Sequence, residues 1–126
     1  MLNLPSAVQI YMAAEPADMR KGFDGLAAVV LARGLDIYSG HLFVFVSRRR
    51  DRVKILTWDR GGFVLYYKRL ERGRFKLPLI SGDTVRLDAG QLAMLLDGVD
   101  IKRVQRNIVW KPRRAATQGI DTAASL

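Results

Sequence analysis

The middle of the chain constrains the fold most strongly, because it holds three short runs in which side chains alternate between the two faces of a strand. The first run, residues 41–46, is apolar on both faces, which is typical of a strand at the centre of a sheet. Residues 53–58 and 63–67 form the next two runs, and the links at 47–52 and 59–62 carry turn residues. This order predicts an antiparallel meander of three strands.

The N-terminal part adds one strand and one helix. Residues 8–12 alternate apolar and polar side chains and predict a strand. From Met19 onward, apolar residues recur at spacings of four, three and four, which predicts a helix that runs to about Ala32. Asp18 is the expected N-cap of this helix, and Gly34 is its expected stop.

The C-terminal part adds shorter elements. We expect a helical turn over residues 68–72, a last strand over 84–87 and a second helix over 89–96, which Gly98 closes. The elements together predict an α+β fold, with a mainly antiparallel sheet of four to five strands and two helices packed on one face of it.

The length of 126 residues suits one domain. We assign residues 1–112 to a single globular domain and residues 113–126, where small and polar residues predominate, to a disordered tail. The chain has no apolar run of about 20 residues, no secretory signal pattern and no cysteine. We therefore expect a soluble protein of the cytoplasm, associated with the nucleoid.

The basic residues are concentrated in one segment. The chain has 21 Lys and Arg against 12 Asp and Glu, a net charge of +9. Residues 1–47 carry −1, residues 48–76 carry +8 and residues 77–126 carry +2. A surface that only needs to be solvated interleaves both signs, so this clustering favours a polyanionic partner.

The expected polyanion is DNA, held through its phosphates by a basic hairpin and the basic segment that follows the meander. A membrane surface is a less suitable partner, because these bases lie on predicted strands and turns and not on an amphipathic helix. The predicted nucleic-acid contacts are Arg48, Arg49, Arg50, Arg52, Lys54, Arg60, Lys68, Arg69, Arg72, Arg74 and Lys76.

No residue pattern predicts a catalytic or metal site. His41 is the one histidine, so the chain cannot form a histidine pair, and its place at the start of a strand favours a structural role. The acidic residues lie beside turns, caps or basic neighbours, and the glycine-containing turns do not have the spacing of a phosphate-binding loop. We expect no catalytic residues, no metal and no cofactor.

Aromatic residues interleave with the basic residues of this segment: Trp58, Phe63, Tyr66, Tyr67 and Phe75. Aromatic faces beside arginines can stack against exposed nucleobases of DNA or RNA, but aromatic residues also alternate in any half-buried sheet. Core packing is the favoured interpretation, with either Tyr66 or Tyr67 exposed, because adjacent residues of a strand face opposite sides.

Several ordered motifs between residues 2 and 100 resemble one protein family. They are Leu4-Pro5-Ser6, Ala17-Asp18-Met19-Arg20-Lys21-Gly22-Phe23-Asp24-Gly25-Leu26, His41-Leu42-Phe43-Val44-Phe45, Trp58-Asp59-Arg60-Gly61-Gly62-Phe63 and Tyr67-Lys68-Arg69-Leu70-Glu71-Arg72-Gly73-Arg74-Phe75. Together they resemble the accessory protein, called TnpB or second-reading-frame protein, of the bacterial insertion sequences of family sixty-six. This family is distinct from the RNA-guided nuclease that shares the name TnpB.

The resemblance implies a non-enzymatic accessory protein, encoded beside a separate transposase and needed for efficient transposition. The family supplies no roles for the motif positions that this chain shares: Asp18, Arg20, Lys21, Asp24, Trp58, Asp59, Lys68, Arg69, Glu71 and Arg74. The ligand we expect is DNA, for example transposon ends, or a complex of the transposase with DNA. The expected partners are therefore DNA and the transposase of the same element.

Two alternatives stay open. The first is an adaptor that binds the transposase through Arg20, Lys21 and Asp24 on the first helix, with only loose affinity for DNA. The lesser alternative is a small metal-independent ribonuclease that uses side chains such as Lys68, Arg72 and Tyr67.

Overall fold

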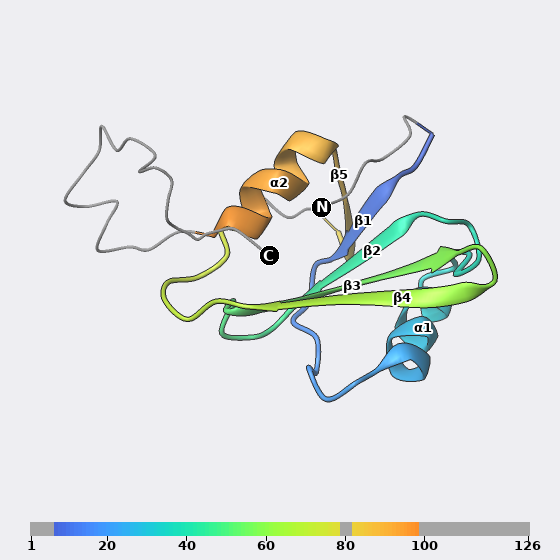
Figure 1. The fold of residues 1–126 in the computed structure, drawn as a ribbon, viewed down its shortest axis with the longest axis horizontal. Helices are drawn as coiled ribbons and strands as arrows, with labels where there is room; N and C mark the ends of the chain where they lie inside the picture. The colour runs from blue at the N-terminus through green and yellow to red at the C-terminus, as the bar shows by residue number, and fades with distance from the viewer. Residues whose placement is uncertain (1–6, 79–81, 99–126) are drawn as a thin grey trace.

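The fold is a five-stranded mixed sheet with one helix on each face (Figure 1). A computed structural model describes residues 7–78 and 82–98. The strand order is β4-β3-β2-β1-β5, with β1 parallel to β2 and all other pairs antiparallel. The strands are β1 (Ile10–Ala13), β2 (Leu42–Val46), β3 (Arg52–Asp59), β4 (Gly62–Arg69) and β5 (Thr84–Leu87), and the helices are α1 (Phe23–Ala32) and α2 (Ala89–Asp97).

The predicted fold class is confirmed. The β2-β3-β4 meander has the expected boundaries to within two residues, and β2 lies at the centre of the sheet with all five of its residues buried. The parallel pair β1 and β2 is joined through α1, as a crossover between parallel strands requires.

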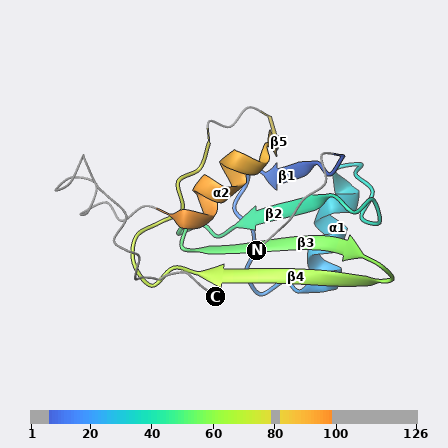
Figure 2. The ribbon, with the colours of Figure 1, turned by 45° about the horizontal axis from the view of Figure 1, so that its top comes forward.

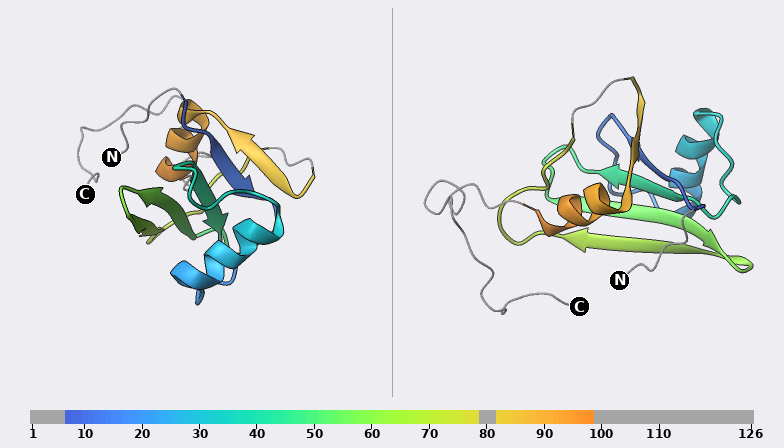
Figure 3. Two further views of the ribbon diagram at one scale, coloured as in Figure 1. Left: turned by 90° about the vertical axis from the view of Figure 1, so that its right-hand side faces the viewer. Right: turned by 90° about the horizontal axis from the view of Figure 1, so that it is seen from above.

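The expectation that both helices pack on one face is wrong. Leu42, Val44 and Val46 of β2 belong to a core covered by α2, whereas Phe43 and Phe45 belong to a second core covered by α1. Figure 3 shows the two helices on opposite sides of the sheet. A central strand that is apolar on both faces needs a cover on each, so the sequence of β2 already required this arrangement.

Helix α1 begins at Phe23, four residues later than predicted, with Gly22 as its N-cap. Asp18 does not cap the helix; its Oδ1 accepts a hydrogen bond from the N–H of Arg20 (2.9 Å) and closes a local turn. Aspartate side chains compete in this way with helix formation, and here the turn takes the residues that the apolar spacing had assigned to the helix.

The helical turn expected over 68–72 is also wrong. Lys68 and Arg69 continue β4, where they pair with Val53 and Arg52 of β3. Strand pairing extends β4 because its partner strand is equally long, a tertiary effect that local propensity does not contain.

Helix α2 agrees with the prediction. Asp88 and Gln91 form a capping box, Leu92 and Leu95 are buried, and Gly98 ends the helix with φ of 72°. The tail predicted for residues 113–126 lies outside the described residues. No helix in the described ranges has the length and apolar character needed to cross a bilayer.

Candidate nucleic-acid interface

The turn between β2 and β3 is fixed by its own hydrogen bonds. Ser47 Oγ accepts bonds from the backbone N–H groups of Asp51 (3.3 Å) and Arg52 (3.1 Å), and the Ser47 hydroxyl donates to Asp51 Oδ1 (3.1 Å). The N–H of Arg50 donates to the Ser47 carbonyl (2.9 Å). The backbone is thereby held while the side chains of residues 48–50 remain exposed.

The segment that follows β4 is attached to this turn. The N–H of Leu70 donates to the Asp51 carbonyl (2.7 Å), and the N–H of Phe75 donates to the Arg50 carbonyl (2.6 Å). The Phe75 side chain is 1% exposed and packs in the core beneath α2. Two segments about 25 residues apart in the sequence therefore lie side by side at one end of the sheet, at the left of Figure 2.

We call this region the basic end, because the two segments place six exposed basic side chains there. In the part of the chain that the structure describes, none of the six takes part in an ion pair. They are Arg48, Arg49 and Arg50 from the turn and Arg72, Arg74 and Lys76 from the attached segment.

The C-terminus of α2 supports the attached segment from behind. A Cβ atom on Gly98 would lie 2.8 Å from Leu70 Cδ1 and would displace that side chain, and the positive φ of Gly98 (72°) also favours glycine. Lys68 Nζ donates a hydrogen bond (2.7 Å) to the Leu96 carbonyl in the last turn of α2. Lys68 was a predicted phosphate contact; the structure uses it to satisfy the helix C-terminus.

Lys54 was also a predicted phosphate contact, yet its side chain is only 7% exposed. Its ammonium donates to the carbonyls of Met19 and Lys21, each at 2.8 Å, and lies 4.8 Å from the centre of the Tyr67 ring. Lys54 therefore anchors the loop that precedes α1, and it is not available at the surface for a ligand.

Arg52 and Arg69 face each other across β3 and β4 beside the basic end. Arg69 forms an exposed ion pair with Glu71 (3.1 Å). Arg52 is half-buried, and its buried Nε has no hydrogen-bond partner among the described residues. Like charges in register destabilise a strand pair, so an anion between these arginines would be favourable.

Arg60 does not belong to the basic end. It lies in the β3–β4 turn, eight residues along β3, which places it roughly 25 Å away at about 3.3 Å per residue. The turn follows the paired residues Trp58 and Phe63, whose rings contact each other and the ring of Tyr38. We call this region the aromatic end, and it lies at the right of Figure 2.

The loop before α1 holds the residues expected to contact a protein partner. Arg20 and Lys21 are exposed, and Asp24 is exposed in the first turn of α1. The Asp18 carboxylate accepts hydrogen bonds from the side chain and the backbone N–H of Arg20, and these bonds lower the pKa of Asp18 to about 2. At neutral pH the Arg20 charge is thus balanced within the loop.

The residues considered for catalysis are not brought together. Tyr67 and Lys68 are adjacent in β4 and face opposite sides of the sheet, and the Lys68 ammonium is already bonded to α2. His41 Nδ1 accepts a hydrogen bond from the Gln9 N–H (3.0 Å), which is a structural contact. Within residues 7–78 and 82–98, no cluster of three or more His, Asp or Glu side chains is arranged to hold a metal ion.

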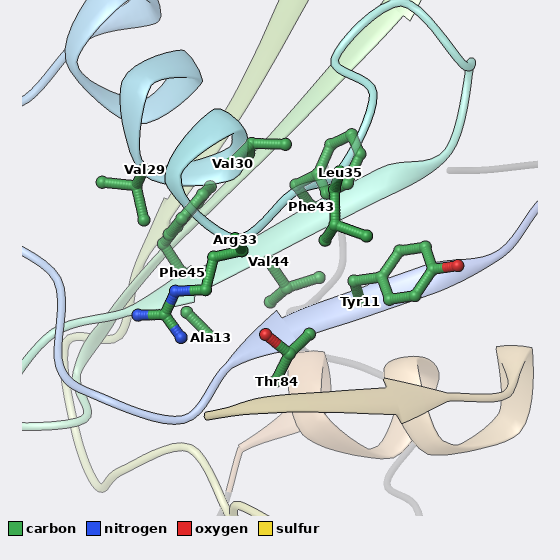
Figure 4. A pocket seen from close by; sticks show the side chains of 10 residues that line it. All are labelled: Tyr11, Ala13, Val29, Val30, Arg33, Leu35, Phe43, Val44, Phe45 and Thr84. Carbon is green, nitrogen blue, oxygen red and sulfur yellow. The ribbon is translucent and has the colours of Figure 1, made fainter. Parts of the chain in front are cut away.

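A surface pocket between α1 and the β1, β2 and β5 strands is mainly apolar (Figure 4). Its charged lining residue, Arg33, donates a hydrogen bond to the Asp83 carbonyl and lies 3.6 Å from the Asp83 carboxylate. Asp83 directly precedes β5, so these contacts join the end of α1 to the edge of the sheet beside the pocket.

Comparisons with known proteins agree with the sequence motifs. The profile of the family described as "IS66 Orf2 like protein" matches residues 8–106. This chain belongs to the IS66 Orf2-like family. Membership in this family implies a role in IS66 transposition.

Two relatives from Sinorhizobium fredii (strain NBRC 101917 / NGR234) match over almost their whole length. The uncharacterized protein y4jC is 34% identical over 117 residues, which cover 92% of this chain and 100% of the relative. The uncharacterized protein y4hO is 37% identical over 114 residues, which cover 88% of this chain and 97% of the relative. No solved structure matches the chain at a significant level.

Proposed function

We propose that this IS66 Orf2-like protein is a non-enzymatic accessory factor of transposition that binds DNA through its basic end. One observation carries the proposal: hydrogen bonds between the β2–β3 turn and residues 70–76 bring six exposed Arg and Lys side chains together at one end of the sheet. When exposed basic side chains replace the counterions condensed on DNA, the binding affinity depends on salt more than on DNA sequence.

Two further features support an anionic ligand at this place. The opposed Arg52 and Arg69 extend the positive surface onto the neighbouring strands, and the buried Nε of Arg52 can still donate a hydrogen bond. Two acids lie nearby, Asp51 and Glu71, and the six exposed basic side chains together with Arg52 and Arg69 outnumber them. A phosphate approaching the basic end therefore meets little opposing charge.

Fluorescence anisotropy over a salt series tests the proposal. The probes are a duplex that carries the terminal inverted repeat of the element and a scrambled duplex of equal length. If about six phosphates are engaged, the slope of log affinity against log salt is about −5, at roughly 0.9 per phosphate. Tighter binding to the terminal repeat would identify an end-recognition factor, and equal binding would identify a general DNA contact.

A matched pair of variants locates the site. R49Q/R74Q removes one exposed positive charge from each segment of the basic end, and R60Q/R86Q removes two exposed positive charges elsewhere. Both double variants lower the net charge equally. We expect the first to make the slope shallower by about 2 and the second to leave it unchanged. Equal slopes for the two variants would overturn the assignment of the site.

A second candidate function is that of an adaptor for the transposase. The observation that favours it is the anchoring of the loop by Lys54, which presents Lys21 and the 45% exposed Phe23 in a fixed position. A preorganised surface loses less conformational entropy when a partner binds.

Co-purification with the transposase separates the two candidates. If the adaptor is correct, the complex survives nuclease treatment and is lost when Arg20, Lys21 and Asp24 are replaced. If DNA bridges the two proteins, nuclease abolishes the complex and R49Q/R74Q weakens it.

A further inference from the structure

The aromatic end presents a fixed, exposed ring. Tyr38 is 59% exposed, and its ring centre lies 5.0 Å from that of Trp58 and 5.8 Å from that of Phe63. The Trp58 and Phe63 rings are half-buried, pair across β3 and β4, and form an edge contact at 5.1 Å. They therefore support one side of the Tyr38 ring and leave much of its surface to solvent.

The loop that carries Tyr38 is held at several points. Asp36 Oδ1 accepts a hydrogen bond from the Tyr38 N–H (2.9 Å), and Ile37 is buried in the core beneath α1. Two residues later, the Gly40 carbonyl accepts a bond from the Thr57 hydroxyl (3.3 Å). The exposure of Tyr38 thus results from the arrangement of its loop, because the residues around it are bonded or buried.

The β3–β4 turn, which follows the Trp58 and Phe63 pair, holds an arginine in a backbone conformation that other residues prefer. Arg60 and Gly61 are the two residues between the paired Asp59 and Gly62, and their φ angles are 48° and 87°. A two-residue turn with positive φ at both positions prefers asparagine, aspartate or glycine at the first. Arginine there is strained, which directs attention to what its side chain does.

We propose that the aromatic end binds an unpaired nucleobase, which stacks on the exposed face of Tyr38 while Arg60 contacts the adjoining phosphate. Aromatic side chains beside arginine are the usual means of holding a single strand, since every base has a π-face. The inference rests on the proposed function, because it adds single-stranded nucleic acid to the duplex as a ligand of the same protein.

The local charge agrees with contact through a base. The exposed carboxylates of Asp36 and Asp59 share this end with Arg60, so the aromatic end lacks the excess of positive charge found at the basic end. A phosphate chain laid across it would be repelled by the acids, whereas a stacked base is neutral. The strand therefore contacts this end through one base and one phosphate.

Anisotropy with a labelled oligothymidylate and an abasic strand of the same length tests the proposal. We compare the wild type with Y38L, which removes the ring, and Y38F, which keeps it. Loss of one base stack should weaken binding of the oligothymidylate between about 5-fold and 150-fold in Y38L. Y38F should bind it like the wild type, and the abasic strand should bind all three proteins equally.

M94A is the control for loss of an exposed apolar side chain elsewhere, and it should leave oligothymidylate binding unchanged. Duplex binding of Y38L should also equal that of the wild type, which shows that the variant is folded. Unchanged oligothymidylate binding in Y38L, or an equal loss on the abasic strand, would overturn the proposal. If the wild type showed no salt-dependent duplex binding, the proposed function would fail while the comparison between the single strands still decided this inference.

Discussion

The two ends of β3 lead into tight turns that each hold an arginine in the left-handed conformation, Arg50 with φ of 61° and Arg60 with φ of 48°. Around Arg50 the neighbours are five further exposed bases, whereas around Arg60 they are three aromatic rings and two carboxylates. The same backbone feature, a tight turn with an arginine at positive φ, therefore lies in two different chemical environments.

The two ends also differ in how they are held together. At the basic end, backbone hydrogen bonds and one buried ring fix the segments, while the long side chains are exposed and form no ion pair among the described residues. At the aromatic end the interacting side chains are themselves fixed by mutual packing. Contact with phosphates tolerates mobile charges because Coulomb attraction is not directional, but stacking requires a ring in a defined orientation. The arrangement at each end suits the contact proposed for it.

The strongest test of this comparison is F75A. Phe75 is almost completely buried, so its truncation should lower the free energy of unfolding by about 3–5 kcal/mol and loosen the segment that it fixes to the turn. F63A removes a half-buried ring at the aromatic end and should cost less than half as much. Urea denaturation measures both values. Equal losses would contradict the view that one buried ring fixes the basic end.

The next largest effect is expected from K54M. The variant removes both hydrogen bonds to the Met19 and Lys21 carbonyls, and the loss of buried bonds costs roughly 1–3 kcal/mol. Hydrogen exchange should increase in the loop before α1. The salt dependence of DNA binding should stay that of the wild type, since a buried ammonium releases no counterion. A slope shallower by about 1 in K54M would mean that Lys54 does contact a phosphate.

The sequence predicted the strands better than it predicted the helices. Alternation of side chains in β2 and the turn residues of the meander are local signals, so the sheet could be read directly. The side of the sheet on which each helix packs depends on contacts between distant segments. The start of α1 was missed because the bonds of Asp18 to Arg20 compete with helix formation, and apolar spacing does not register them.

The DNA contacts stay a prediction, and the structure adds only where each basic residue lies. The excess of charge directed attention to residues 48–76, but charge does not distinguish an exposed basic side chain from a buried one. Lys54 binds carbonyls more than 30 residues away, and Lys68 binds the end of α2, so both depend on tertiary structure. Tyr38 was not considered, although Asp36 two residues earlier is a typical signal of a local turn that would expose it.

A smaller effect is expected when glycine replaces either left-handed arginine. R50G and R60G should each stabilise the fold by up to about 1 kcal/mol, because glycine adopts positive φ without strain. Only R50G should make the salt slope of duplex binding shallower, by about 1. Thermal denaturation and anisotropy measure the two effects. A shallower slope in R60G would remove the functional distinction between the ends.

The smallest effect concerns the loop before α1, which belongs to neither end. Hydrogen bonds from Arg20 lower the pKa of Asp18 to about 2 from an ordinary value of 3.8. Because the folded pKa lies below the unfolded one, the stabilisation is complete above about pH 4 and is lost as the pH falls through 2. A carboxyl-carbon NMR titration measures this pKa, and in R20Q it should return toward 3.8. A pKa that stayed near 2 in R20Q would contradict this, because groups other than Arg20 would then stabilise the carboxylate.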